Sequence, residues 1–161
     1  MALTKINNNT LSAITGLPAG VGGKVLQVVT ATSGGVSVSS QTDVTTGITA
    51  SITPSSTSSN ILISITSVIA YTSYGSRSSD YCGVNLKRNT TSILGGGNND
   101  FCSVWELSNH GFNFPVAISY VDSPSTTSST SYTLFSRVQT SGESAYWNNG
   151  IGGRITLMEI A

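Results

Sequence analysis

The first residue to consider for chemistry is the single histidine, His110, because a general base in an enzyme is most often an imidazole. It lies in a turn-like segment, residues 108–113, and any of 28 serines could be paired with it as a nucleophile, so the combination indicates nothing specific. The sequence Gly-x-Ser-x-Gly, which presents a nucleophilic serine on a strand-to-helix turn, does not occur. We therefore predict that the protein is not an enzyme and that His110 forms loop or interface hydrogen bonds.

Residues that bind metals or phosphates are equally sparse. Cys82 and Cys102 with one histidine do not complete a zinc site, and the seven acidic residues occur singly, without the alternating pattern of a calcium loop. The run Gly95-Gly96-Gly97 lacks the Lys-Ser or Lys-Thr that ends a phosphate-binding loop, so it predicts a strand connection. We predict no cofactor and no metal. The two cysteines permit at most one disulfide, and we favour buried thiols.

Several aromatic residues are candidates for binding. Tyr71, Tyr74 and Tyr81, together with Tyr146 and Trp147, could form a platform for a sugar. The alternative is that amphipathic aromatics at strand ends pack under loops or at subunit contacts, and we favour this alternative. Tyr74, Tyr146 and Trp147 are therefore the candidate contacts with a receptor or a neighbouring subunit.

The overall composition excludes some classes of function. The chain has 161 residues and a mass of 16.6 kDa, which is enough for one domain with a hydrophobic core. Charged residues are only 9% of the chain, against about 25% in an ordinary globular protein. Seven basic residues balance seven acidic ones. Without an excess of cations, we expect neither nucleic-acid binding nor attachment to an anionic membrane surface.

Hydroxyl groups supply the polar surface that charges would otherwise provide. The 28 serines and 21 threonines together make up 49 of the 161 residues. Thr favours strands and Ser favours turns, so this composition suits β-structure. A surface with no net charge does not repel copies of itself, which favours assembly. No signal peptide and no membrane-spanning run is visible, so we expect synthesis in a reducing cytoplasm.

Residues 1–23 differ from the rest of the chain and are predicted to be an N-terminal anchoring arm. Apolar residues occur singly among Asn, Thr, Ser and Gly, and four glycines in nine positions disfavour a helix. A disordered tail is the alternative, but a solvated tail does not need Leu and Ile at this density. The predicted anchoring residues are Ile6, Leu11, Ile14, Leu17 and Pro18.

Apolar and polar residues alternate with a period of two from residue 24 to residue 161, which predicts one β-domain. The predicted strands cover residues 25–29, 44–52, 61–71, 81–88, 101–107, 114–120, 132–138 and 154–159. Hydroxyl-rich turns, residues 55–60 and 122–130, separate some of them. We predict an all-β fold: an antiparallel β-sandwich, jelly-roll-like, with about eight or nine strands. An immunoglobulin-like sandwich is the alternative, but its cysteine spacing would be longer, with the tryptophan between the cysteines.

Four stretches together resemble a family of small virion structural proteins of tailed bacteriophages, frequent in phages of aquatic bacteria. The stretches are Gly23-Lys24-Val25-Leu26-Gln27-Val28-Val29, residues 51–63 (SITPSSTSSNILI), residues 115–127 (PVAISYVDSPSTT) and residues 155–160 (ITLMEI). They are strand and turn signatures, and the resemblance covers about residues 23–161. It implies a trimeric β-sandwich knob, an N-terminal segment that attaches the knob to the particle, and no catalytic residues.

Residues and resemblance together lead to one expected function. The chain has no heptads or repeats for a fibre shaft, so we expect a homotrimeric capsid decoration (cement) protein in the virion. Its arm would bind the assembled shell, with the major capsid protein or another virion protein as partner. The alternative is a short tail or head fibre knob that binds a glycan on the host cell surface.

Overall fold

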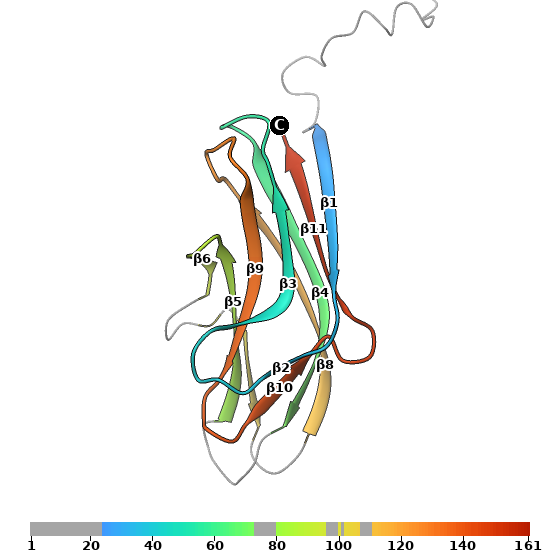
Figure 1. The fold of residues 1–161 in the computed structure, drawn as a ribbon, viewed down its shortest axis with the longest axis vertical. Helices are drawn as coiled ribbons and strands as arrows, with labels where there is room; N and C mark the ends of the chain where they lie inside the picture. Colours follow the sequence, from blue (N-terminus) through green and yellow to red (C-terminus); the bar gives the residue numbers. More distant parts are fainter. Residues whose placement is uncertain (1–23, 73–79, 96–99, 101, 107–110) are drawn as a thin grey trace, which may run out of the picture.

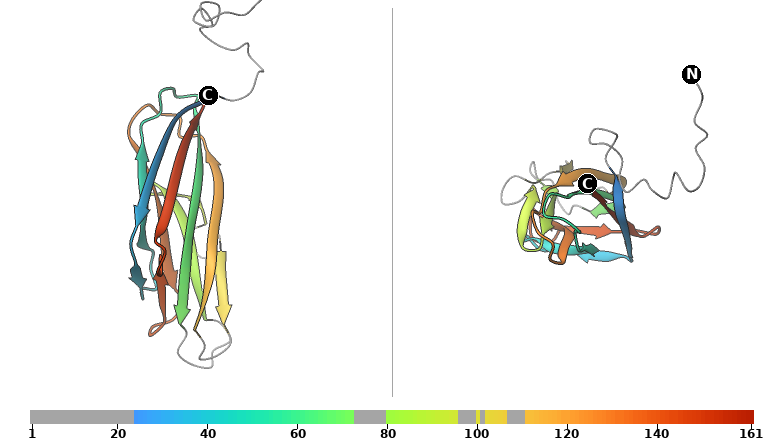
Figure 2. Two further views of the ribbon diagram at one scale, coloured as in Figure 1. Left: turned by 90° about the vertical axis from the view of Figure 1, so that its right-hand side faces the viewer. Right: turned by 90° about the horizontal axis from the view of Figure 1, so that it is seen from above.

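The computed structural model describes residues 24–72, 80–95, 100, 102–106 and 111–161. These residues form eleven strands and no helix. Every strand pair is antiparallel, and the strands form two layers packed face to face (Figure 1 and Figure 2). The predicted antiparallel β-sandwich is confirmed, whereas the predicted arm, residues 1–23, lies outside the described residues.

The two sheets divide the strands unequally. Sheet A contains six strands: β1 (Val25–Ser33), β2 (Val36–Val38), β4 (Asn60–Thr72), β8 (Gly111–Asp122), β10 (Ser144–Trp147) and β11 (Gly153–Ile160). Sheet B contains five: β3 (Val44–Ile52), β5 (Asp80–Arg88), β6 (Thr91–Leu94), β7 (Cys102–Glu106) and β9 (Thr130–Val138).

The strand order is that of a jelly roll. β1 and β2 pair in succession with β11 and β10, which both pair with β4, and β8 pairs with the other edge of β4. In sheet B, β3 pairs with β9, β9 with β5, and β5 with both β6 and β7. Three pairs of consecutive strands lie in the same sheet and can each be treated as one interrupted strand: β1 with β2, β6 with β7, and β10 with β11. The fold then has eight strands in two four-stranded layers, as in a jelly roll.

The core lies between the two sheets and follows the predicted alternation. The inward residues of β4 are fully buried, and the inward residues of β3, β5 and β9 meet them from sheet B. Because side chains alternate across a strand, one apolar face of each strand suffices to fill this layer. The central core residues are Ile48, Ile52, Ile61, Ile63, Ile65, Ile69, Tyr71, Val84, Leu86, Tyr132, Leu134, Ile155 and Leu157.

A buried carboxylate, that of Glu159, lies at the end of the core where β11 ends. It accepts hydrogen bonds from the Ser55 backbone N–H at 2.7 Å, from the Ser55 hydroxyl at 2.6 Å and from Gln27 Nε2 at 2.6 Å. These bonds, those from Ser55 above all, stabilise the ionised form and lower the pKa of Glu159 from 4.5 to about 2. Glu159 therefore ties β1, β11 and the turn after β3 together as an anion.

Replacing Glu159 with Gln should remove an acid-sensitive part of the stability. Because the folded pKa is lowered, the carboxylate stabilises the fold above pH 4.5, and this contribution is lost as the pH falls toward 2. We expect urea midpoints of the wild-type protein to fall across this window. The midpoints of E159Q should start lower at pH 6 and fall less. Parallel declines in the two proteins would contradict this account of Glu159.

Candidate functional site

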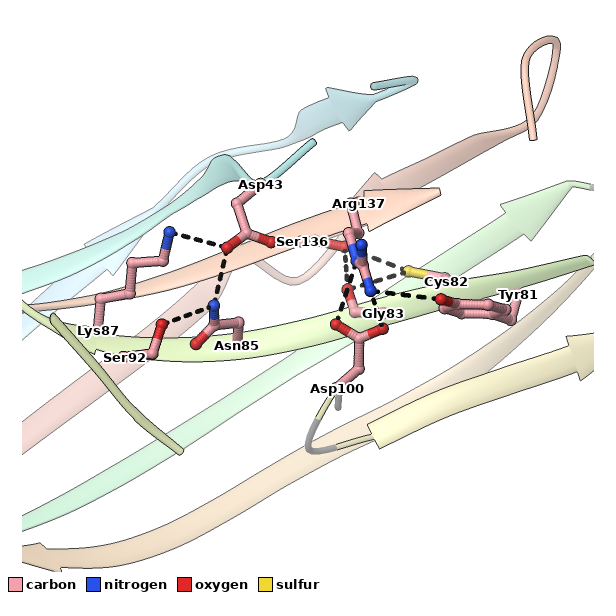
Figure 3. Close-up of polar contacts among 10 residues, drawn as sticks. All are labelled: Asp43, Tyr81, Cys82, Gly83, Asn85, Lys87, Ser92, Asp100, Ser136 and Arg137. Atoms are coloured by element: carbon pink, nitrogen blue, oxygen red, sulfur yellow. Dashed lines mark hydrogen bonds and ion pairs between the residues drawn. The ribbon is translucent and has the colours of Figure 1, made fainter. Parts of the chain in front are cut away.

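The outer face of sheet B carries charges that are already partnered within the chain (Figure 3). Arg137 forms a two-point contact with Asp100, from Nη2 at 2.9 Å and from Nε at 3.2 Å. Lys87 Nζ lies 2.8 Å from Asp43 Oδ2, and the same oxygen accepts a hydrogen bond from Asn85 Nδ2 at 2.8 Å. Since each of these groups has a partner, this face holds its own loops in place and offers little to a ligand.

Gly83 on β5 explains how Asp100 reaches Arg137. A β-carbon at Gly83 would collide with the carboxylate of Asp100 as it lies here, so a larger residue at this position would have to displace the acid. The neighbouring Cys82 is fully buried, with its Sγ 3.2 Å from the hydroxyl of Ser136. The side chain of Cys102 lies outside what the structure describes, so the preference for two buried thiols stays a prediction.

The outer face of sheet A carries an apolar row instead. Strand register places Val28 beside Met158, Met158 beside Leu62, and Leu62 beside Val121, so the row crosses the full width of the sheet. Val28 and Val121 are each 54% exposed, although both are large aliphatic residues. Solvent-facing strand positions are usually polar, so a continuous row of four aliphatic side chains indicates a contact surface.

The next two rows along the same face are polar. Two residues further along each strand, Thr30, Thr156, Ser64 and Ser119 form a row of hydroxyl groups. Two residues further again, the row is Thr32, Arg154, Thr66 and Ala117. The guanidinium of Arg154 is the one charge among the outward-facing residues of sheet A that the structure describes, and it takes part in none of the three ion pairs found there.

A groove of about 390 Å³ surrounds this last row. Its floor includes Thr32, Thr66 and Arg154, and one side is formed by Val68 and Pro115. The other side is formed by the loop between β10 and β11, which carries Ile151 with 78% of its surface exposed. This loop projects from sheet A on the side away from sheet B (Figure 1). The groove thus combines a cation, two hydroxyl groups and aliphatic walls.

Buried Asn148 fixes the position of this loop, in an arrangement that we call the Asn148 anchor. Its Oδ1 accepts a hydrogen bond from the hydroxyl of Ser67 at 2.8 Å. Its Nδ2 donates to the carbonyl oxygens of Gly34 at 2.7 Å and Thr46 at 3.1 Å. Its backbone N–H donates to Val68 O at 2.8 Å. The side chain therefore joins the loop to β4, to the β1–β2 connection and to β3.

The predicted binding aromatics occupy different environments. Tyr146 and Trp147 are consecutive on β10 and so face opposite sides of the sheet. Tyr146 is 43% exposed, whereas Trp147 is fully buried in the core, a placement incompatible with the receptor or subunit contact predicted for it. Tyr74 and His110 lie outside the described residues, as do Ile6, Leu11, Ile14, Leu17 and Pro18 of the arm.

Neither the apolar row nor the groove was predicted from the sequence. A signal for the row was present, because Leu62 and Met158 are apolar residues on the more polar side of their strands. No comparable signal exists for the groove, since its walls come from strands far apart in the sequence and from a loop whose path depends on Asn148.

Within the described ranges, no group of three or more His, Cys, Asp or Glu side chains could hold a metal ion. The same part of the chain contains no helix long and apolar enough to cross a membrane. No protein-family model matches the chain, and no curated protein matches it.

Proposed function

We propose that this chain is a non-catalytic virion structural protein of a tailed bacteriophage: a homotrimeric capsid decoration protein whose copies meet through the apolar row of sheet A. The observation that carries the proposal is this row, Val28, Met158, Leu62 and Val121, which lies on an outer sheet face without neighbouring charges. Covering it with a second copy removes aliphatic surface from water, which contributes about 1 kcal/mol for each half-exposed side chain.

An edge of sheet A that no described strand covers supports the same proposal. β8 is twelve residues long and pairs with β4 along one edge, and residues 111–121 contain no charge. Long uncharged edge strands invite pairing with another chain, and closed assembly protects them. Val121, at the end of the apolar row, lies on this strand, so one neighbouring copy could cover both the row and the edge.

The position of the chain ends fits an arm that attaches such an assembly to a shell. The backbone N–H of Ala161 donates to Lys24 O at 3.0 Å, so residue 24 lies at the end of the sandwich nearest the apolar row. Residues 1–23 would therefore leave the trimer close to its subunit contacts. Binding only the assembled shell, the arm would stabilise it by mass action. Jelly rolls occur in viral capsid proteins and in lectins, so the fold permits this role without requiring it.

The mass of the purified protein in solution tests the proposal. Sedimentation equilibrium should give about 50 kDa, three times the 16.6 kDa of one chain. Leu62→Lys places a like charge on every copy at the centre of the row, and we expect it to yield folded monomers. Ser51→Lys, at an exposed position on the outer face of sheet B, is the matched control and should stay trimeric. A monomeric wild-type chain, or a trimeric L62K, would refute the proposed contact.

The second candidate, a short fibre knob that binds a host glycan, is favoured by the groove around Arg154. Protein staining of purified particles separates the two candidates, because a decoration protein is present in many copies and a fibre tip in few.

A chain that lacks residues 2–20 should remain trimeric and lose attachment to the particle if the arm is the anchor.

A further inference from the structure

We propose that the groove around Arg154 binds an acidic sugar, of the hexuronate class, with the sugar carboxylate on the Arg154 guanidinium. This site goes beyond the proposed assembly and gives the second candidate, a knob that binds a host glycan, a defined class of ligand. The inference does not depend on the trimer, because every lining residue belongs to one chain.

The charge of the groove selects an anion. Arg154 is exposed at the centre of a sheet face on which no other charged residue faces outward in the described strands. Unlike Arg154, three other cations already have a carboxylate partner: Lys87, Arg88 and Arg137. A guanidinium presents a planar pair of N–H donors that matches a carboxylate, so Arg154 has both the charge and the geometry for one.

The rest of the lining suits a sugar ring. Thr32 and Thr66 flank Arg154 in the same cross-strand row, and their hydroxyl groups can exchange hydrogen bonds with ring hydroxyls. Val68, Pro115 and Ile151 provide aliphatic surface for the C–H face of a pyranose. The volume of about 390 Å³ is at the small end of ligand pockets, which span about 300–1,000 Å³, and fits a single sugar unit.

An acidic peptide fits the groove less well. Extended peptides usually bind by adding a strand to an open sheet edge, where the backbone supplies the hydrogen bonds. Of the three floor strands, β11 lies between β1 and β4, and β4 lies between β11 and β8, while β1 pairs with β11 on the edge that faces the groove. The floor therefore offers side chains and no backbone ladder, which favours a ligand recognised through its carboxylate and hydroxyls.

The groove stays accessible if copies meet at the apolar row. On β11, Arg154 is four residues from Met158, a distance of about 13 Å along the strand. The loop between β10 and β11 projects from sheet A (Figure 1). Its residue Ile151 lines the groove, so a second flat sheet cannot cover both the apolar row and the groove at once. Contact at the row and binding in the groove are therefore compatible.

The test uses the full chain and two probes that differ only in the carboxylate, methyl glucuronide and methyl glucoside, followed by NMR titration of backbone amides. We expect the glucuronide to shift the signals of Thr32, Thr66 and Arg154 with a dissociation constant on the order of 1 mM. The glucoside should bind at least about tenfold more weakly, because it lacks the charge-assisted contact. Arg154→Gln should reduce glucuronide binding by the same factor.

Lys24→Gln is the matched control, since it removes an exposed cation at the far end of β1 and should leave glucuronide binding unchanged. Equal binding of the two sugars, or R154Q binding at wild-type strength, overturns the site. A blocked Gly-Glu-Gly peptide that binds as tightly as the glucuronide overturns the assignment to sugar. Because Arg154 is exposed at a strand position where Gln is readily accommodated, loss of binding in R154Q can be separated from unfolding by comparing its spectrum with that of the wild type.

Discussion

Replacing Asp122 with Ala should destabilise the protein by about 3 kcal/mol, because it removes a buried carboxylate whose two oxygens both accept hydrogen bonds, while the donors remain. Asp122 ends β8 and is 8% exposed. Arg88 Nη1 lies 3.0 Å from each of its two oxygens, and the buried hydroxyl of Tyr132 donates to Oδ2 at 2.8 Å. Urea denaturation at pH 7 measures the loss.

The effect is large because both partners lose something that water cannot fully replace. Burial raises the pKa of Tyr132 well above its ordinary value of 10, so the phenol stays a neutral hydrogen-bond donor. In D122A this buried donor would have no acceptor, which costs about 1–3 kcal/mol of stability. The side chain of Arg88 is 29% exposed, so water screens its ion pair with Asp122 and the loss of this pair costs less free energy. The two contributions together give the expected value.

Two further variants separate these contributions. Asp122→Asn keeps an oxygen that can accept from Tyr132 and loses the charge opposite Arg88, so we expect a smaller effect than in D122A. Tyr132→Phe removes the hydroxyl alone and should cost about 1 kcal/mol. In the double variant Y132F/D122A, the losses should be less than additive. Strict additivity, or a D122A effect below about 1 kcal/mol, would show that this cluster does not hold the end of the core.

The sequence pattern predicted the long strands well because their period is two and one of their faces is almost wholly apolar. Ile61, Ile63, Ile65 and Ile69 on β4 are all buried, as the alternation required. The two-layer antiparallel sandwich follows from such strands, since each has one face to bury. The eleven strands observed exceed the predicted eight or nine because β2, β6 and β10 have only three or four residues, too few for a period to be recognised.

The surfaces that carry the proposals were not predictable in the same way. The apolar row depends on the register between β1, β11, β4 and β8, and register is set by turns and packing rather than by any one strand. The burial of Trp147 likewise follows from the pairing of β10, whose parity could not be assigned without its partners. A pattern within one strand fixes which residues share a face, whereas neighbours across strands come only from the fold.

Replacing Asn148 with Ala should cost about 3 kcal/mol and also weaken binding in the groove, because this residue holds the wall of the groove in place. Asn148 is 2% exposed and has a φ of 60°, in the left-handed region where Asn is tolerated and Ala is strained. Its loss leaves the carbonyl oxygens of Gly34 and Thr46 without their donor. Thermal unfolding and amide hydrogen exchange in residues 148–152 measure the two effects.

Three substitutions at this position distinguish backbone strain from lost hydrogen bonds. Asn148→Gly removes the side chain but accepts the left-handed φ, so it should be about 1 kcal/mol less harmful than N148A. Asn148→Asp places a carboxylate oxygen against the carbonyls of Gly34 and Thr46, so it should be the most harmful of the three. If the glucuronide binds N148A as tightly as the wild type while exchange in the loop accelerates, the wall contributes no binding and Arg154 acts from the floor alone. If exchange in the loop is also unchanged, the Asn148 anchor does not fix the loop, because the hydrogen bonds of its side chain would then be replaceable by water.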